Sequence, residues 1–151
     1  VATIAGFGVA ARLAAEELPA RRAHAEALVA RLRSGLGDMP GVTLHGDPGR
    51  TSGTTVSAGF DGCDGPLLAM CLDLAGFAVS SGAACSSGSP EPSPVLLALG
   101  LPVAAARSAL RISVGAGNTA ADIDAFLAAL PAALARVRGA ISDGDWRTVE
   151  P

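Results

Sequence analysis

Apolar residues recur at helical spacing in two long segments, one near each end of the chain. In residues 2–36 the leucines fall near the spacing of helical turns, and pairs of charged residues occupy the other side. Because Pro19 removes a backbone hydrogen bond and clashes with the preceding turn, we expect a kink there or two helices that meet. The second segment begins at Thr119 and Asp122, which resemble a capping pair, and should bend at Pro131. Its apolar stripe consists of Ile123, Phe126, Leu127, Leu130, Leu134 and Val137.

Between these segments, apolar and polar residues alternate in the way that short strands do. Residues 42–45 and 54–60 are predicted strands, and residues 77–79 a brief third one. The stretch "ALRISVG", residues 109–115, alternates most clearly, with leucine, isoleucine and valine on one face and Arg111 on the other. We therefore expect a sheet with one apolar and one polar face.

Prolines mark the start of short helices between the predicted strands. Residues 66–74 form an apolar helix that begins with a proline, and residues 103–107 form a further helical turn. Ser93 is the expected N-cap of a helix over residues 94–100. Short strands mixed with helices, without regular βαβ units, predict an α+β layer domain.

The composition limits the kinds of partner to expect. At 151 residues, half of them hydrophobic, the chain is long enough to bury the core of one domain. A net charge of −3 and singly scattered arginines give no electrostatic footprint for nucleic acid or an anionic membrane. No apolar run reaches the roughly 20 residues of a membrane span, and no signal-peptide pattern is present. We therefore expect no nucleic acid, no membrane and a cytoplasmic location.

The three cysteines differ in their surroundings. Cys85 lies among serines, alanines and two glycines, so its thiol should be accessible, and access is one requirement of a reactive thiolate. From composition alone, an incidental cysteine in a surface loop is an equal alternative. Cys71 lies in an apolar helix and should pack in the core, and Cys63 should be a turn residue without a role. Their spacing matches no zinc site, and the odd number indicates a reducing compartment without a disulfide framework.

Arg111 is the second candidate for chemistry. A guanidinium on the polar face of an apolar strand can bind a carboxylate through two parallel hydrogen bonds. The alternative is a solvated or ion-paired arginine on the sheet surface. Neither histidine is assigned a catalytic role, because His24 lies on a charged helix surface and His45 beside a Gly-Asp turn.

Several segments together resemble one known family. "SSGAACSSGSPEPSPVLLALG", residues 80–100, resembles the active-cysteine segment of the cysteine desulfurases, class V aminotransferase-like enzymes that supply sulfur for iron-sulfur clusters and thiocofactors. "ALRISVG" and "NTAADID" are similar to the family's strand and helix start on the C-terminal side of that segment. "VATIAGFG", "GVTLHGD" and "TTVSAGF" resemble the family's elements on its N-terminal side. The resemblance covers nearly the whole chain.

This resemblance implies a domain plan, that of the small C-terminal domain of a fold-type I pyridoxal-phosphate enzyme. Residues 1–36 would be a helix connecting to the cofactor domain, and residues 37–138 the small α+β domain. Within it, residues 80–92 would form the active-cysteine loop, and residues 139–151 would be a C-terminal tail.

The resemblance also implies a mechanism. Pyridoxal phosphate acts as an electron sink that weakens the C–S bond of L-cysteine. The Cys85 thiolate then attacks the substrate sulfur, which leaves a persulfide on Cys85 and releases L-alanine. Arg111 would bind the substrate carboxylate. The sulfur would pass to an acceptor or iron-sulfur scaffold protein, with a transient contact between Cys85 and a forming cluster, and the enzyme would be a homodimer.

The chain contains no lysine, so it cannot form the Schiff base by which this family holds its cofactor. We therefore expect pyridoxal phosphate to be held by a part of the enzyme absent from this chain, and the chain alone to be inactive. Because the chain begins with Val1 and not with methionine, a fragment of a longer enzyme is favoured over a separate subunit.

Two other functions remain open from the sequence. Selenocysteine lyase shares the fold and the cofactor. A non-catalytic module that carries persulfide or docks a scaffold would keep the fold alone. The presence of both Cys85 and Arg111 favours the enzyme, because a docking module would not need a carboxylate-binding arginine.

Overall fold

The computed structural model describes residues 1–47, 49–82 and 92–143. Within these residues, four antiparallel strands form one sheet in the order β1-β2-β4-β3. The strands are β1 (Val42–His45), β2 (Thr55–Phe60), β3 (Ser80–Ser81) and β4 (Ala109–Ser113). The helices are α1 (Ala2–Gly37), α2 (Gly65–Leu74), α3 (Pro94–Ala98), α4 (Val103–Arg107) and α5 (Ala120–Asp143). The predicted α+β fold class is confirmed.

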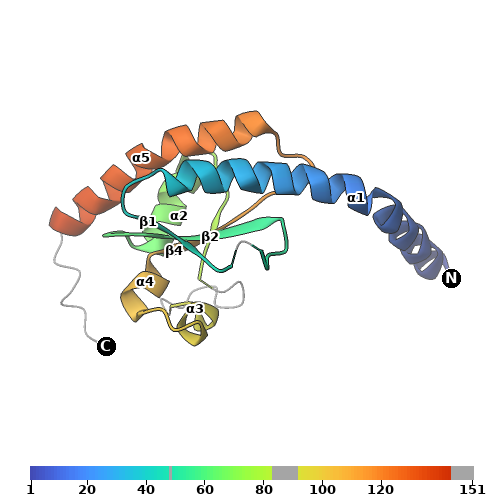
Figure 1. Ribbon diagram of the computed structural model, residues 1–151, viewed down its shortest axis with the longest axis horizontal. Coiled ribbons are helices and arrows are strands. Elements are labelled where there is room, and N and C mark those ends of the chain that lie inside the picture. Colours follow the sequence, from blue (N-terminus) through green and yellow to red (C-terminus); the bar gives the residue numbers. More distant parts are fainter. Residues whose placement is uncertain (48, 83–91, 144–151) are drawn as a thin grey trace.

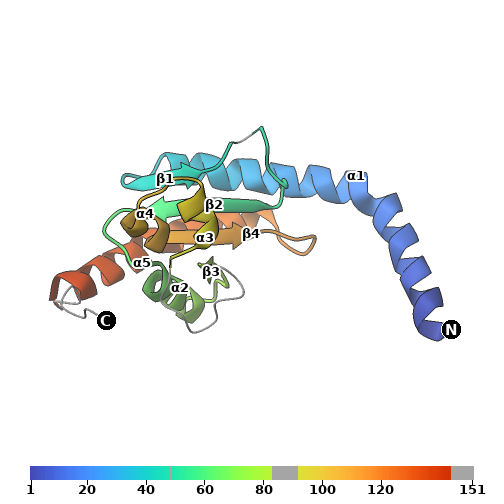
Figure 2. The same ribbon diagram turned by 90° about the horizontal axis from the view of Figure 1, so that it is seen from below.

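The helices divide between the two faces of the sheet. α1 and α5 run side by side over one face, with α2 packed against α5, whereas α3 and α4 lie on the opposite face (Figures 1 and 2). We call the face beneath α3 and α4 the open face. In the part of the chain that the structure describes, no helix is long and apolar enough to cross a membrane.

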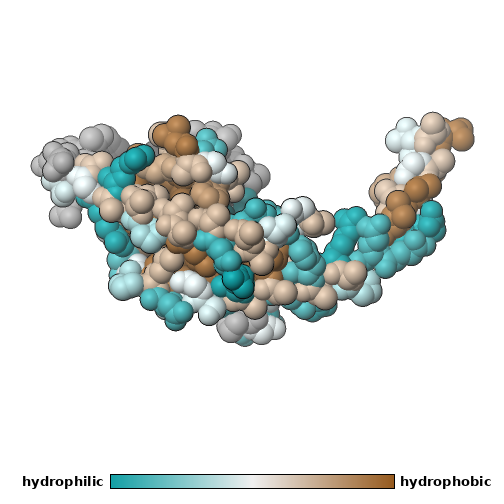
Figure 3. All heavy atoms as spheres, turned by 90° about the horizontal axis from the view of Figure 1, so that it is seen from above, coloured by the Kyte–Doolittle hydropathy of each residue, from teal (hydrophilic) through white to brown (hydrophobic). Residues whose placement is uncertain are grey.

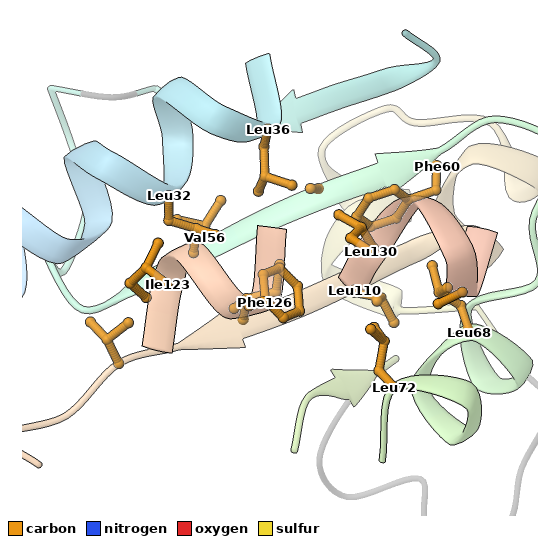
Figure 4. Close-up of a cluster of buried hydrophobic side chains, with 14 of the residues drawn as sticks. Leu32, Leu36, Val56, Phe60, Leu68, Leu72, Leu110, Ile123, Phe126 and Leu130 are labelled. Atoms are coloured by element: carbon orange, nitrogen blue, oxygen red, sulfur yellow. The ribbon is translucent and has the colours of Figure 1, made fainter. Parts of the chain in front are cut away.

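The core lies between the sheet and the helices α1, α2 and α5. Alternation in β2 and β4 turns Val56, Phe60 and Leu110 toward these helices, as predicted, and each is buried. Full burial of such a side chain contributes about 1.5–3 kcal/mol. Figure 4 shows how they meet the buried helix residues Leu32, Leu36, Leu68, Leu72, Ile123, Phe126 and Leu130.

Helix α1 continues through Pro19 as one helix, so the alternative of two helices is wrong, and Figure 2 shows a bend within this helix. Figure 2 shows the N-terminal part of α1 turned away from the rest. The first buried residue of α1 is Ala25, and everything before it is exposed. Figure 3 shows hydrophobic spheres at this free end, where Ile4 and Phe7 are each 77% exposed.

One predicted strand lies elsewhere in the structure. The third strand is Ser80–Ser81 and not residues 77–79, because the pairing to β4 places Ser80 opposite Arg111. Phe77 instead packs its ring against that of Phe126, with the centroids 5.7 Å apart. α5 continues to Asp143, so the helix extends into residues 139–151, for which the sequence predicts a C-terminal tail.

Side-chain caps fix where two of the helices begin. The Asp64 carboxylate accepts a hydrogen bond from the Leu67 N–H at 3.0 Å. Thr119 and Asp122 bond reciprocally: Asp122 Oδ2 accepts from the Thr119 N–H at 2.7 Å, and Thr119 Oγ1 accepts from the Asp122 N–H at 3.3 Å. The predicted capping pair is confirmed, and caps of this kind contribute about 1 kcal/mol.

We predict opposite effects of alanine at two helix glycines. A Cβ at Gly65 would lie 2.6 Å from the carbonyl oxygen of Arg107 and 2.9 Å from that of Ala109, so backbone must move. Gly65→Ala should lower the free energy of unfolding by about 1–3 kcal/mol. Gly139 in α5 has open space around it, so Gly139→Ala should raise that free energy by up to about 1 kcal/mol. Urea unfolding measures both, and equal effects would contradict the close approach at Gly65.

Candidate functional site

A row of polar residues crosses the open face at the middle of the sheet. The strand registers place His45 opposite Ser57, Ser57 opposite Arg111, and Arg111 opposite Ser80. Residues directly opposed in antiparallel strands point to the same face, with their Cβ atoms about 4.5–5.5 Å apart. Four residues far apart in the sequence therefore form one continuous line of side chains.

A cavity of about 320 Å³ lies over this row. Its sheet side is polar, with His45, Ser57 and Arg111, whereas Val95 and Leu96 of α3 contribute an apolar side. Other lining residues are Gly46, Thr55, Gly82, Ser93, Leu99, Ala109 and Leu110. A concave site with an apolar wall and a few convergent polar groups is typical of small-molecule binding.

Arg111 is the cationic group of this cavity. Its side chain is exposed, on the open face as predicted, and among the described residues it has no hydrogen-bond or ion-pair partner. Several other arginines are paired; Arg31, for example, holds Asp124 through two hydrogen bonds of 2.6 and 2.7 Å. The Arg111 guanidinium can therefore bind a carboxylate through two parallel hydrogen bonds without first breaking an ion pair in the described structure.

Cys85, the predicted reactive thiol, lies outside the described residues together with the rest of segment 83–91. The described residues on either side of that segment are Gly82 and Pro92. Gly82 lines the cavity, and so does Ser93. The described residues on both sides of segment 83–91 therefore lie at the cavity. The role of Cys85 stays a prediction, as does that of Arg111.

His45 is a cavity residue to which the sequence pattern assigned no role. Its ring packs over Gly59, where an added Cβ would lie 2.8 Å from Nε2. Nε2 is buried and has no hydrogen-bond partner among the described residues. Burial lowers the pKa of His45 below its usual 6.5, so the imidazole is neutral at pH 7. Alternation along residues 42–45 predicts the face of the strand on which His45 lies. Only the strand register shows that His45 shares a row with Arg111.

The other histidine and the two described cysteines lie away from this cavity. His24 Nε2 is 2.9 Å from the carbonyl oxygen of Asn118, which links α1 to the start of α5. Cys63 and Cys71 are half-buried and pack against the core, and burial raises the pKa of the Cys63 thiol. The described part of the chain contains no cluster of three histidine, cysteine or acidic residues that could hold a metal ion.

Comparison with known proteins shows the family. Residues 1–126 match the family model described as aminotransferase class-V. The chain belongs to the aminotransferase class-V family. Within this family it is 41% identical over 143 residues to an IscS-like cysteine desulfurase of Mycobacterium tuberculosis, a match that covers 93% of this chain and 36% of the relative. It is 41% identical over 133 residues to the cysteine desulfurase IscS of Clostridium botulinum, a match that covers 86% of this chain and 34% of the relative.

Solved structures agree with this family assignment. A NifS-like protein from Rickettsia africae aligns with a TM-score of 0.74 and 27% identity, over 86% of this chain and 33% of that chain. A second NifS-like protein aligns with a TM-score of 0.71 and 29% identity, over 82% and 31%. The resemblance to cysteine desulfurases is confirmed, and the chain spans about a third of the length of the curated relatives that it matches.

We predict that His45 titrates below 6.5, because burial penalises its charged form. An NMR titration of the His45 ring measures this pKa directly. In the unfolded chain the pKa of His45 returns to about 6.5. The stability that neutral, buried His45 contributes is therefore complete above pH 6.5 and is lost as the pH falls through the pKa of His45 in the folded chain. Urea unfolding between pH 7.5 and 5 should show that loss, and His45→Gln should remove it. A His45 pKa of 6.5 or above would contradict the burial.

Proposed function

We propose that this chain is the part of a pyridoxal-phosphate-dependent cysteine desulfurase that binds the substrate carboxylate and receives the sulfur. The observation that supports it most concerns Arg111, which has no partner among the described residues and lines the same cavity as Gly82 and Ser93, beside the Cys85 segment. The names of the relatives support the same reaction.

In this proposal the chain's own residues have two tasks. Arg111 binds and orients the carboxylate of L-cysteine, and the apolar wall from α3 lowers the exposure of the ion pair to water. Cys85 receives the sulfur: its S–S bond to the substrate sulfur forms as the substrate C–S bond breaks, and the freed carbon takes up a proton. The products are a Cys85 persulfide and L-alanine, so atoms and electrons balance between Cys85 and L-cysteine without a further oxidant.

The residues of this chain do not fit as the covalent site of pyridoxal phosphate. A Schiff base requires a lysine amine, and all 11 basic residues other than histidine are arginines. We propose that protein outside this chain holds the cofactor, and that the chain alone is inactive. The proposal further includes a homodimeric, cytoplasmic enzyme that passes its sulfur to an acceptor or iron-sulfur scaffold protein, with a transient contact between Cys85 and the forming cluster.

The test uses the whole protein that contains this chain, purified from its own cells and incubated with L-cysteine. Alkylation and peptide mass spectrometry should map one extra sulfur to Cys85, with release of L-alanine. Arg111→Met should raise KM for L-cysteine about 10- to 100-fold, because hydrogen bonds to a charged group contribute about 1.5–3 kcal/mol. Arg136→Met, an exposed arginine of α5 on the other side of the sheet, is the matched control and should leave KM unchanged.

The same experiment separates the alternatives. Sulfur that reaches Cys85 only when another enzyme supplies it would make the protein a persulfide carrier or docking module. Turnover of L-selenocysteine without turnover of L-cysteine would make it a selenocysteine lyase. An unchanged KM for L-cysteine in Arg111→Met would show that Arg111 does not bind the substrate carboxylate.

A further inference from the structure

Two polar side chains of the cavity lie directly beside each other on neighbouring strands. In the register of β2 with β4, Ser57 is paired with Arg111. Directly opposed residues of an antiparallel pair point to the same face, with their Cβ atoms about 4.5–5.5 Å apart. Both residues also line the cavity. One small ligand in this cavity can therefore contact the Ser57 hydroxyl and the Arg111 guanidinium together.

Three hydroxyl side chains line the cavity, and they differ in their positions and partners. The hydroxyl of Thr55 already lies 3.2 Å from that of Ser113, within hydrogen-bond distance. Ser93 belongs to the segment that leads into α3 and not to the sheet. Ser57 is the hydroxyl residue that the strand register places opposite Arg111. A ligand held by Arg111 therefore has Ser57 as its neighbouring hydroxyl on β2.

The Ser57 hydroxyl is free to bind a ligand. It has no hydrogen-bond partner among the described residues, and it does not bond to the neighbouring Arg111. Ser57 is half-buried. In the described part of the chain, the sealed side-chain polar atom without a partner is His45 Nε2, so the unpartnered Ser57 oxygen keeps contact with open space. The two neighbours on β2 and β4 thus both have hydrogen bonds to offer to a third group.

We propose that Ser57 is a second substrate-binding residue, whose hydroxyl donates a hydrogen bond to the carboxylate that Arg111 binds. This inference rests on the proposed function, because it takes the substrate carboxylate at Arg111 as given. The two oxygens of a carboxylate offer about four acceptor positions, and two parallel bonds from a guanidinium use two of them. An acceptor position on the carboxylate therefore remains for the hydroxyl.

The charges of the cavity suit this arrangement. Among the described lining residues the ionisable side chains are Arg111 and His45, and burial lowers the pKa of His45 so that it is neutral at pH 7. One carboxylate therefore balances the charge of Arg111. The Ser57 hydroxyl adds a bond from a second strand without adding charge, so it fixes the orientation of the carboxylate more closely than Arg111 alone.

The test uses the whole protein that contains this chain, with its cofactor bound. Ser57→Ala should raise KM for L-cysteine about tenfold and leave kcat unchanged, which is the lower end of the effect of a hydrogen bond to a charged group. Ser57→Thr keeps a hydroxyl on a residue that suits a strand and should restore most of the affinity. Ser113→Ala is the matched control and should leave KM unchanged, because Ser113 lies on β4 outside the cavity lining.

A binding measurement separates loss of the carboxylate contact from a general disturbance of the cavity. 3-Mercaptopropionate has the carboxylate and the thiol of L-cysteine without the amine, whereas cysteamine has the thiol and the amine without the carboxylate. In calorimetry, Ser57→Ala should weaken binding of 3-mercaptopropionate about tenfold and leave binding of cysteamine unchanged. A structural effect of the substitution would weaken both ligands.

Unchanged affinity for 3-mercaptopropionate in Ser57→Ala, or equal weakening of both ligands, would overturn the inference. Failure to bind 3-mercaptopropionate in the parent protein would overturn it too. Arg111→Met separates this failure from that of the proposed function. A raised KM in Arg111→Met with an unchanged KM in Ser57→Ala would reject Ser57 alone. If neither variant changes KM, both carboxylate contacts are wrong, and the mapping of sulfur to Cys85 decides the reaction independently.

Discussion

The pairing of β2 with β4 is the constraint on which both the core and the candidate site depend. Along these strands alternate residues serve opposite faces, so Leu110 and Ile112 enter the core while Arg111 between them faces the cavity. A slip of one residue would exchange the faces and place a guanidinium in the core. The apolar packing against α1 and α5 therefore holds Arg111 in place without any contact to it.

The cavity exists because a second, smaller apolar cluster holds the short helices on the open face. Leu96 of α3, Ala106 of α4 and Ala109 of β4 are buried together there. Gly65, at the start of α2, allows α2 to approach the backbone at Arg107 and Ala109, where α4 joins β4. Small residues thus set the distance between the polar row and the apolar wall, and with it the size of ligand that the cavity can accept.

Local patterns predicted most of the elements, because alternation, helical spacing and capping act over a few residues. They gave the strand of Arg111, the face on which it lies and the cap formed by Thr119 and Asp122. The third strand was misplaced by a few residues, because its position depends on pairing with β4 and on the ring contact of Phe77 with Phe126. His45 carries no local signal of a role for the same reason: its place in one row with Arg111 depends on the strand register, which no local pattern encodes. The flanking residues and the family resemblance point to Cys85, which lies outside the described residues.

The two parts of α1 differ in the free energy needed to unfold them, because the first part has no buried side chain in the described structure. Before Ala25, roughly 35 Å of helix at 1.5 Å per residue extends without a buried side chain. The C-terminal third can open only when the core opens, whereas the preceding turns fray at little cost in free energy. Any surface that covers Ile4 and Phe7 therefore converts a marginal helix into a rigid connection across the bend in α1. The stiffness of this arm is thus set by what it contacts, whereas the stability of the sheet is set within the chain.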